Sequence, residues 1–364
     1  MRILHILNHT RRLNGHVHAA VDLACAQVSM GHQVYLASEG GDFDTLLKAK
    51  GIETLFIGHQ RKIPTLVRAL SRLNSYMRQF DIDVVHAHMM TSAVISFPIC
   101  KLRRVPLITT VHNEFEKSAT LMGLGTRVIA VSDVVGASMR RRGVPQSKLK
   151  VVLNGTIGSS RSEGRSEEPK PLRSPSILFV GGLHPRKGLP DLFDAFETVH
   201  RSFPTAHLYI VGDGPFREEY KARAAALESA SDITFVGATR DPYPYMLGAD
   251  IFVLPSHADP APLVLSEARE AGCAVIGSSV DGIPQLLEDG EAGLLVPPRD
   301  PDALAKMLSH LLEAPERITD WRRKSQLRIE RLTIERVAKE TLDVYYSAMP
   351  RAKALALATP GPTA

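Results

Sequence analysis

Two carboxylates, Asp259 and Glu267, have seven residues between them where an acidic loop is expected to pass into a helix. Pro260 and Pro262 precede the first turn, where proline is favoured because its missing N–H would have no partner. A helix start offers free N–H groups and a positive dipole end, which suit a phosphate, and a carboxylate can accept hydrogen bonds from sugar hydroxyls. The block therefore predicts a phosphate or sugar site. A surface helix with an acidic start is the alternative.

The elements that must position this block alternate along the chain. Apolar stretches such as RILHIL, DVVHAH and PLITTVH are interleaved with amphipathic segments, and the pattern resumes with SILFVGGL, HLYIVGDG and IFVLPS. Such alternation is typical of a parallel sheet with helices on both faces. Residues 157–176 interrupt it with Ser, Arg, Glu and Pro. Ligands of such sheets bind at the carboxyl ends of the strands.

We therefore expect an α/β protein with two doubly wound domains. They should span residues 1–160 and 177–330, with a linker over 161–176. A charged amphipathic helix is expected over about 317–349. Its end, 331–350, should pack back towards the first domain, and residues 351–364 should form a disordered tail.

The composition excludes several classes of protein. The chain has 364 residues, 44% of them hydrophobic, and a formal net charge of +5. Three separated cysteines in apolar segments suggest neither a disulfide framework nor a zinc cluster, which fits a reducing cytoplasm. No apolar run is long enough to cross a membrane, and the first residues look like a strand and not a signal peptide. No nucleic-acid motif accompanies the modest positive charge.

The acidic block also resembles a known family. The motif consists of Pro255-Ser256, Asp259, Glu267-Ala268 and Gly272, followed by DGIP. This order resembles the family-4, group 1 retaining glycosyltransferases, and the resemblance continues through VGGLHPRKG, LYIVGDGP, VIAVSD and VVLNG, so it covers nearly the whole chain. It implies the GT-B fold, in which two Rossmann-like domains face each other across a cleft. The first would take the acceptor and the second a nucleotide-sugar donor.

The resemblance implies roles for four residues of the block. Glu267 would accept hydrogen bonds from both ribose hydroxyls of the nucleotide. Asp259 would contact the hydroxyls of the donor sugar as part of the catalytic machinery. The backbone N–H groups of Leu263 and Val264 would face the donor phosphate or sugar.

Basic and glycine-rich turns complete the expected donor site. The resemblance makes Lys187 a catalytic residue that binds the donor diphosphate, and Arg186 a partial substitute for a family arginine. Gly212, Val236 and Gly237 would line the nucleotide pocket. A solvated basic turn and simple tight-turn geometry are the alternatives. A dinucleotide fingerprint is not expected, because its third glycine is absent.

The chain departs from the family pattern at four positions. An aspartate replaces the first glutamate, and the others are a proline for glycine, a glycine for arginine and a glutamine for glutamate: Asp259, Pro262, Gly182 and Gln285. Pro262 offers no N–H and Asp259 is one methylene shorter. We expect the chain to differ from its relatives at the sugar end of the donor.

In the first half, Gly15 lies where the family turn lets backbone approach a phosphate. His112 matches a family histidine that faces the donor sugar, where it would hold a hydroxyl or share the acceptor's proton. Glu114 follows closely and could orient it. His86 and His88 lie on one side of a strand, but no third ligand follows at a suitable spacing, so we expect structural histidines and no metal. The DID sequence at 81–83 is read as a strand-entry turn.

A basic helix is expected over residues 59–80, which contain no acid. Its cations are Arg61, Lys62, Arg68, Arg72 and Arg78. An ordinary solvated helix is one interpretation. Peripheral contact with an anionic membrane, at the inner face of the cell membrane, is the other.

Together these features predict a retaining glycosyltransferase that moves a hexose-type sugar from a nucleotide-diphosphate donor to a hydroxyl of a cell-surface glycan or glycolipid precursor. No cofactor or metal and no nucleic acid is expected. A non-catalytic partner subunit that binds nucleotide or glycan is one alternative, favoured by the four departures. A nucleotide-sugar epimerase of the same fold is another, weaker because the spacing from Asp259 to Glu267 is that of the transferases.

Overall fold

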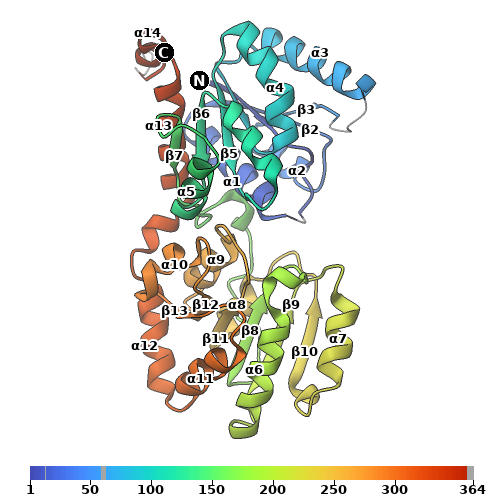
Figure 1. Cartoon of the computed structure of the whole chain (residues 1–364), viewed down its shortest axis with the longest axis vertical. Coiled ribbons are helices and arrows are strands. Elements are labelled where there is room, and N and C mark those ends of the chain that lie inside the picture. The colour runs from blue at the N-terminus through green and yellow to red at the C-terminus, as the bar shows by residue number, and fades with distance from the viewer. Residues whose placement is uncertain (13, 59–62, 359–364) are drawn as a thin grey trace. The chain divides into compact units, whose positions relative to one another are not determined.

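The chain folds into two compact units. A computed structural model describes residues 1–12, 14–58 and 63–358. The first unit combines Met1–Ser162 with Thr333–Ala364, and the second is Glu163–Leu332 (Figure 1). Both units are α/β, as the alternation of strands and helices predicts.

The described part of the first unit contains a seven-stranded parallel sheet in the order β3-β2-β1-β4-β5-β6-β7. Its strands are β1 (Arg2–Ile6), β2 (Gln33–Ser38), β3 (Glu53–Phe56), β4 (Val84–Ala87), β5 (Leu107–Val111), β6 (Arg127–Ala130) and β7 (Leu149–Val151). Its helices are α1 (Gly15–Ser29), α2 (Asp44–Ala49), α3 (Ile63–Gln79), α4 (Met90–Arg103), α5 (Asp133–Arg141), α13 (Ile334–Ala348) and α14 (Arg351–Ala358), with 3₁₀ turns η1 (Lys117–Leu124) and η2 (Ser160–Ser162).

The second unit, Glu163–Leu332, has a six-stranded sheet in the order β10-β9-β8-β11-β12-β13. Its strands are β8 (Ser176–Val180), β9 (His207–Val211), β10 (Ile233–Gly237), β11 (Ile251–Leu254), β12 (Ala274–Ser278) and β13 (Leu294–Val296). Its helices are α6 (Leu189–Ser202), α7 (Arg217–Ala225), α8 (Tyr243–Gly248), α9 (Leu263–Glu270), α10 (Ile283–Leu286), α11 (Pro301–Leu312) and α12 (Pro315–Ser325), with 3₁₀ turns η3 (Pro185–Lys187), η4 (Ala230–Asp232), η5 (Glu288–Gly290) and η6 (Ile329–Leu332).

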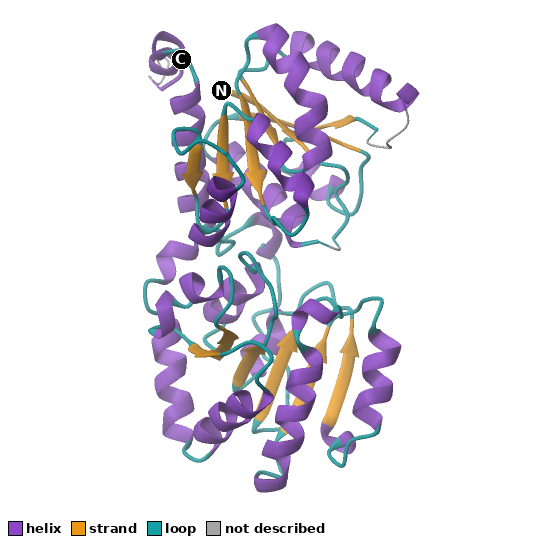
Figure 2. Ribbon diagram, viewed as in Figure 1, coloured by secondary structure: helices purple, strands orange, loops and turns teal. Residues whose placement is uncertain are grey.

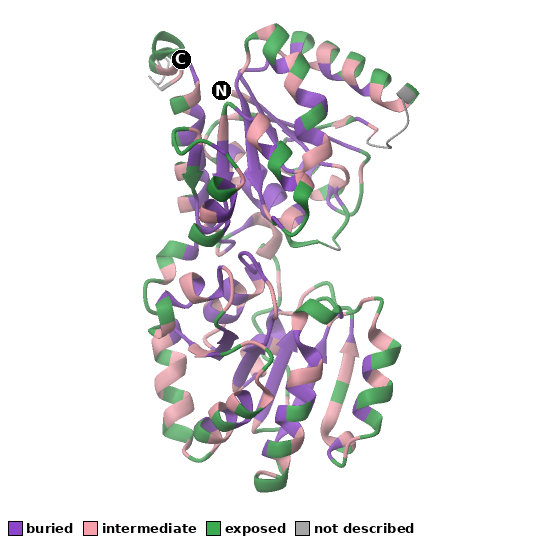
Figure 3. Ribbon diagram, in the orientation of Figure 1, coloured by how far each residue is buried: buried purple, intermediate pink, exposed green. Residues whose placement is uncertain are grey.

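Each sheet is built around buried central strands. Strands β4 and β5 of the first sheet and β8, β9, β11 and β12 of the second are buried throughout (Figure 3). Continuous apolar strands fit a parallel sheet, which needs cover on both faces, and helices flank both sheets (Figure 2). In both sheets the strand order reverses beside the first strand, between β1 and β4 and between β8 and β11. Such a reversal is where doubly wound sheets bind ligands.

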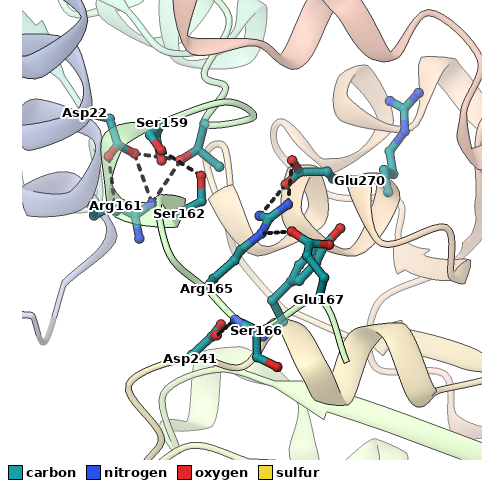
Figure 4. Close-up of polar contacts among 12 residues, drawn as sticks. Asp22, Ser159, Arg161, Ser162, Arg165, Ser166, Glu167, Asp241 and Glu270 are labelled. Atoms are coloured by element: carbon teal, nitrogen blue, oxygen red, sulfur yellow. Dashed lines mark hydrogen bonds and ion pairs between the residues drawn. The ribbon is translucent and has the colours of Figure 1, made fainter. Parts of the chain in front are cut away.

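The expected linker over 161–176 is held by specific polar contacts in each unit (Figure 4). In the first unit, Arg161 forms a bidentate pair with buried Asp22 at 2.8 and 2.9 Å, and Thr156 donates to the same carboxylate at 2.6 Å. In the second, Arg165 forks onto Glu270 at 2.9 Å and stacks 3.4 Å from the Tyr243 ring. The polar composition of the segment therefore serves ion pairing.

The C-terminal region differs from the single helix expected over 317–349. Helix α12 ends at Ser325 and α13 begins at Ile334, with Arg328 at a positive φ of 54° between them. Helix α13 packs on α1 in the core of the first unit. Residues 351–358 form α14, so the disordered tail is a wrong prediction there, and 359–364 lie outside the described residues.

Replacing Arg161 by Met should lower the free energy of unfolding by about 3 kcal/mol, because the Asp22 carboxylate is left buried without its cation. The matched control is Arg323→Met, since Arg323 is 78% exposed in its pair with Asp320 and should cost less than about 1 kcal/mol. Urea denaturation measures both variants. Equal losses would contradict a structural role for the Arg161 pair.

Candidate functional site

Loops at the carboxyl ends of β8, β9 and β11 touch one another in the second unit. Gly188 has a φ of +69°, and a Cβ there would lie 1.8 Å from the Pro255 carbonyl oxygen. Gly212 has a φ of +142°, and its Cβ would lie 1.9 Å from the Gly181 carbonyl oxygen. Only glycine permits this backbone and this approach. The tight-turn alternative for Gly212 therefore explains its residue type without any ligand.

An ion pair joins two of the predicted site residues across these loops. Lys187 Nζ lies 2.5 Å from Asp259 Oδ2, and the two side chains are only 13% and 9% exposed. The Asp259 backbone N–H donates to Asp281 Oδ2 at 2.7 Å. Burial raises the pKa of Asp281, and the hydrogen bond from Asp259 opposes this shift. The residues assigned to the diphosphate and to the sugar thus meet at one point.

Helix α9 begins at Leu263, directly after the loop that carries Asp259. Pro262 is its N-cap, with no side-chain cap. Val264 and Glu267 are three residues apart and half-buried, so they share one face of the helix, whereas Leu263 is buried. Helix α9 therefore carries its first N–H groups and the Glu267 side chain on one element, which fixes their positions relative to each other.

A buried cation that the sequence analysis did not find anchors α9. Arg269 is fully buried and donates to the carbonyl oxygens of Ser325 at 2.8 Å, Leu286 at 2.5 Å and Leu327. Burial lowers its pKa to about 10, so the guanidinium stays charged at neutral pH. Only its place two residues after Glu267 could have drawn attention to it.

The remaining predicted donor residues lie on the same edge of this sheet or next to Lys187. A register shift between Phe235 and Gly237 leaves Val236 as the extra residue of a bulge, and the Gly237 carbonyl accepts from Gly212 at 2.9 Å. Arg186 is exposed in η3, and its carbonyl accepts from His257 at 2.7 Å. The donor roles of all these residues stay predictions.

In the first unit, His112 follows β5 and lines a cavity of about 200 Å³ together with Asn8, His16, His88 and Thr110. Its Nε2 lies 3.2 Å from Nδ1 of His88, a contact that orients this ring, and the orienting role suggested for Glu114 stays a prediction. Burial lowers the pKa of His112 to about 3, which keeps the ring neutral.

Gly15 is exposed at the start of α1, and a Cβ there would meet no atom within 4 Å. Packing does not explain its residue type.

The expectation that His86 and His88 lack a third imidazole is wrong. His5 pairs in register with His86 across β1 and β4, and ring nitrogens of His5, His86 and His88 lie within 4.8 Å of one another. The third histidine comes from a neighbouring strand far away in sequence, where spacing rules do not reach. That the protein uses no metal stays a prediction. The acids of the DID sequence bind Arg2, as expected of structural residues.

Two family models match the chain: Glycosyltransferase Family 4 over residues 13–156 and Glycosyl transferases group 1 over 160–328. The phosphatidyl-myo-inositol mannosyltransferase of Mycobacterium leprae is 31% identical over 66% of this chain and 67% of that protein. The Mycolicibacterium smegmatis protein of that name is 28% identical over 75% and 73%. The chain thus spans about two thirds to three quarters of these relatives.

Solved structures share the fold. The Anabaena protein HepE, in complex with UDP, has a TM-score of 0.81 and 20% identity, covering 95% of this chain and all of HepE. Sucrose-phosphate synthase from Thermosynechococcus elongatus has a TM-score of 0.76 and 20% identity over 95% and 98%. Two parallel sheets with this strand order form the GT-B fold, as the resemblance implied.

Replacing Gly188 by Ala should lower the free energy of unfolding by about 2–4 kcal/mol, because the methyl group would overlap the Pro255 carbonyl at a positive φ. Gly182→Ala is the control from the same loop. Its Cβ would lie 3.9 Å from the nearest atom, so the change should stay within about 0.5 kcal/mol. Thermal and urea denaturation test both. A tolerated Gly188→Ala would contradict the close contact of the loops.

Proposed function

The chain belongs to the group 1 glycosyltransferases, and we propose that it is a retaining enzyme that moves a hexose-type sugar from a nucleotide-diphosphate donor to an acceptor hydroxyl. The observation that carries the proposal is the Lys187–Asp259 ion pair at the strand reversal of the second sheet. It brings a cation for a diphosphate and a carboxylate for sugar hydroxyls together at one point.

In the proposed donor complex, Lys187 and the first turn of α9 stabilise the diphosphate. Both supply positive charge from fixed positions, as electrostatic catalysis of a charged leaving group requires. Glu267, on the same helix, accepts from the ribose hydroxyls, and the bulge at Val236 offers backbone groups to the base. We propose that this charge serves in place of a metal ion.

The proposed reaction retains the configuration of the sugar. The bond from the anomeric carbon to the diphosphate oxygen breaks, and the acceptor oxygen bonds to the same face. The acceptor's proton passes to the departing phosphate oxygen. Because the donor supplies the base, the protein acts through positioning and electrostatics. Asp259 holds hydroxyls of the donor sugar, and His112 holds a sugar hydroxyl or shares the acceptor's proton.

We propose a glycan or lipid-linked acceptor made at the inner face of the cell membrane. The relatives named above are mannosyltransferases of a phospholipid, and UDP occupies HepE, which supports a nucleotide-sugar donor.

In the described residues, no helix combines the length and apolarity needed to cross a membrane. Helix α3 carries Arg68, Arg72 and Arg78 beside Val67, which is 59% exposed, so it suits an anionic surface. Arg61 and Lys62 lie outside the described residues.

The donor follows from a thermal-shift screen with UDP, GDP, ADP and their sugars, since a ligand of the folded state raises the Tm. The best nucleotide sugar is then tested for release of nucleoside diphosphate, with and without lipid acceptors. Turnover supports the transferase. Binding without release under any condition would favour the non-catalytic partner subunit.

Asp259→Asn should separate binding from chemistry. Without the carboxylate, Lys187 is released towards the diphosphate, so the nucleoside diphosphate should bind roughly fivefold more tightly in calorimetry. Transfer from the nucleotide sugar should fall about 100-fold, because the sugar loses its positioning carboxylate. The control is Asp194→Asn, an exposed ion-paired aspartate on α6, which should change neither value. Weaker nucleotide binding together with unchanged transfer would contradict these roles.

A further inference from the structure

A continuous chain of polar side chains is buried beneath the cavity of the first unit. Its members are, in order, Thr110, His86, Tyr345, Gln27, His5, His88 and His112. They come from β5, β4, α13, α1 and β1 and from the ends of β4 and β5. The distances between consecutive members are 2.6, 2.6, 3.2, 2.8, 2.9 and 3.2 Å. We name this chain the histidine relay. Both of its ends, Thr110 and His112, line the same cavity of about 200 Å³.

The amide of Gln27 determines where the protons lie on one branch. Gln27 Nε2 donates to the Tyr345 hydroxyl, so its Oε1 accepts from Nε2–H of His5. A neutral imidazole has one N–H and one bare nitrogen. Nδ1 of His5 is therefore bare and accepts from Nε2–H of His88. By the same rule, Nδ1 of His88 accepts from Nε2–H of His112.

The other branch runs in the opposite direction from the same amide. The Tyr345 hydroxyl accepts from Gln27, and Nδ1 of His86 is its other hydrogen-bond partner among the described residues, so the buried hydroxyl donates its own proton there. Nε2–H of His86 then donates to Thr110 Oγ1. An amide cannot exchange its donor and acceptor by moving a proton and must rotate by half a turn instead. Gln27 therefore fixes the direction of every hydrogen bond in the relay.

The relay is neutral near pH 7, which the assignment of one proton to each ring requires. Burial lowers the pKa of His5 to about 4 and of His112 to about 3, and it lowers the pKa of His86 and His88 well below the ordinary value. Each ring nitrogen of His5, His86 and His88 also contacts a protein partner. A metal on these rings would have to replace such contacts. The 2.9 Å between His5 and His88 is a hydrogen-bond length.

We propose that the histidine relay makes the cavity a receptor for one sugar hydroxyl, by presenting a bare Nδ1 on His112 and the hydroxyl proton of Thr110 together. A hydroxyl can donate to the first and accept from the second at once. Gln27 and Tyr345 are then positioning residues that act through the relay. This inference rests on the proposed function for the identity of the ligand, whereas the proton positions are independent of it.

The test is ¹⁵N NMR of the full-length protein labelled at histidine, without donor. Signals of His112 are assigned with the His112→Asn variant. Protonated and bare ring nitrogens are well separated in such spectra, and His112 should show a protonated Nε2 and a bare Nδ1. A proton on Nδ1, or a ring that titrates near pH 6.5, would overturn the relay.

Tyr345→Phe tests whether a buried residue away from the cavity determines the tautomer of His112. The variant removes the acceptor that holds the Gln27 amide, so the amide can rotate and His112 should show both tautomers. Tyr346→Phe is the matched control, because it removes the neighbouring hydroxyl outside the relay and should leave His112 unchanged. If Tyr345→Phe melts early, Gln27→Met removes the same lock and should give the same mixture. An unchanged His112 in a folded lock variant would overturn the proposal.

Two further measurements separate the relay from its rivals. With donor and acceptor, Tyr345→Phe should lower kcat/KM about three- to tenfold and Tyr346→Phe should not. A wild-type protein that transfers no sugar would refute the proposed function, while the tautomer of His112 still decides the relay. Titration with Zn²⁺ should leave the signals of His5, His86 and His88 in place. Stoichiometric Zn²⁺ binding at those rings would show a metal site in place of the relay.

Discussion

The reversal of strand order beside β8 determines where the second unit can gather its chemistry. Strands β8 and β11 are neighbours in the sheet but continue into loops that lead to different elements, and doubly wound sheets bind their ligands at such a point. The backbones of these two loops approach closely because Gly188 has no side chain, and Gly212 allows the loop after β9 an equally close approach to Gly181. That contact places Lys187 from the first loop beside Asp259 from the second. The cation, the carboxylate and the start of α9 all depend on this one close approach.

The first unit uses the same reversal for a different purpose. His5 on β1 and His86 on β4 are partners across it, and neutral, hydrogen-bonded side chains lie there instead of an ion pair. The contrast is physical. A charged leaving group requires fixed opposite charge, whereas a neutral sugar hydroxyl requires a donor and an acceptor in set positions. The two units of the proposed transferase would thus supply electrostatics and hydrogen-bond direction separately.

The sequence predicted what is encoded locally or carried by the family pattern. Alternating apolar segments predicted two α/β units, and the motif residues Lys187 and Asp259 do lie together. The sequence did not predict the contacts between residues that are far apart along the chain. Gln27 and Tyr345 are 318 positions apart, and His5 joins His86 and His88 only through strand pairing. The boundary between the two units falls inside the polar segment predicted as a linker, but charge composition could not show that Arg161 and Arg165 are ion-paired there.

The central claim is that a nucleotide-sugar diphosphate binds at the strand reversal of the second unit. A crystal structure of the protein with its best nucleotide sugar from the thermal-shift screen tests it most directly. We expect Lys187 Nζ and the first N–H groups of α9 to contact the diphosphate, Glu267 the ribose hydroxyls and Asp259 the sugar. A diphosphate bound away from Lys187, or a ribose that does not contact Glu267, would contradict it.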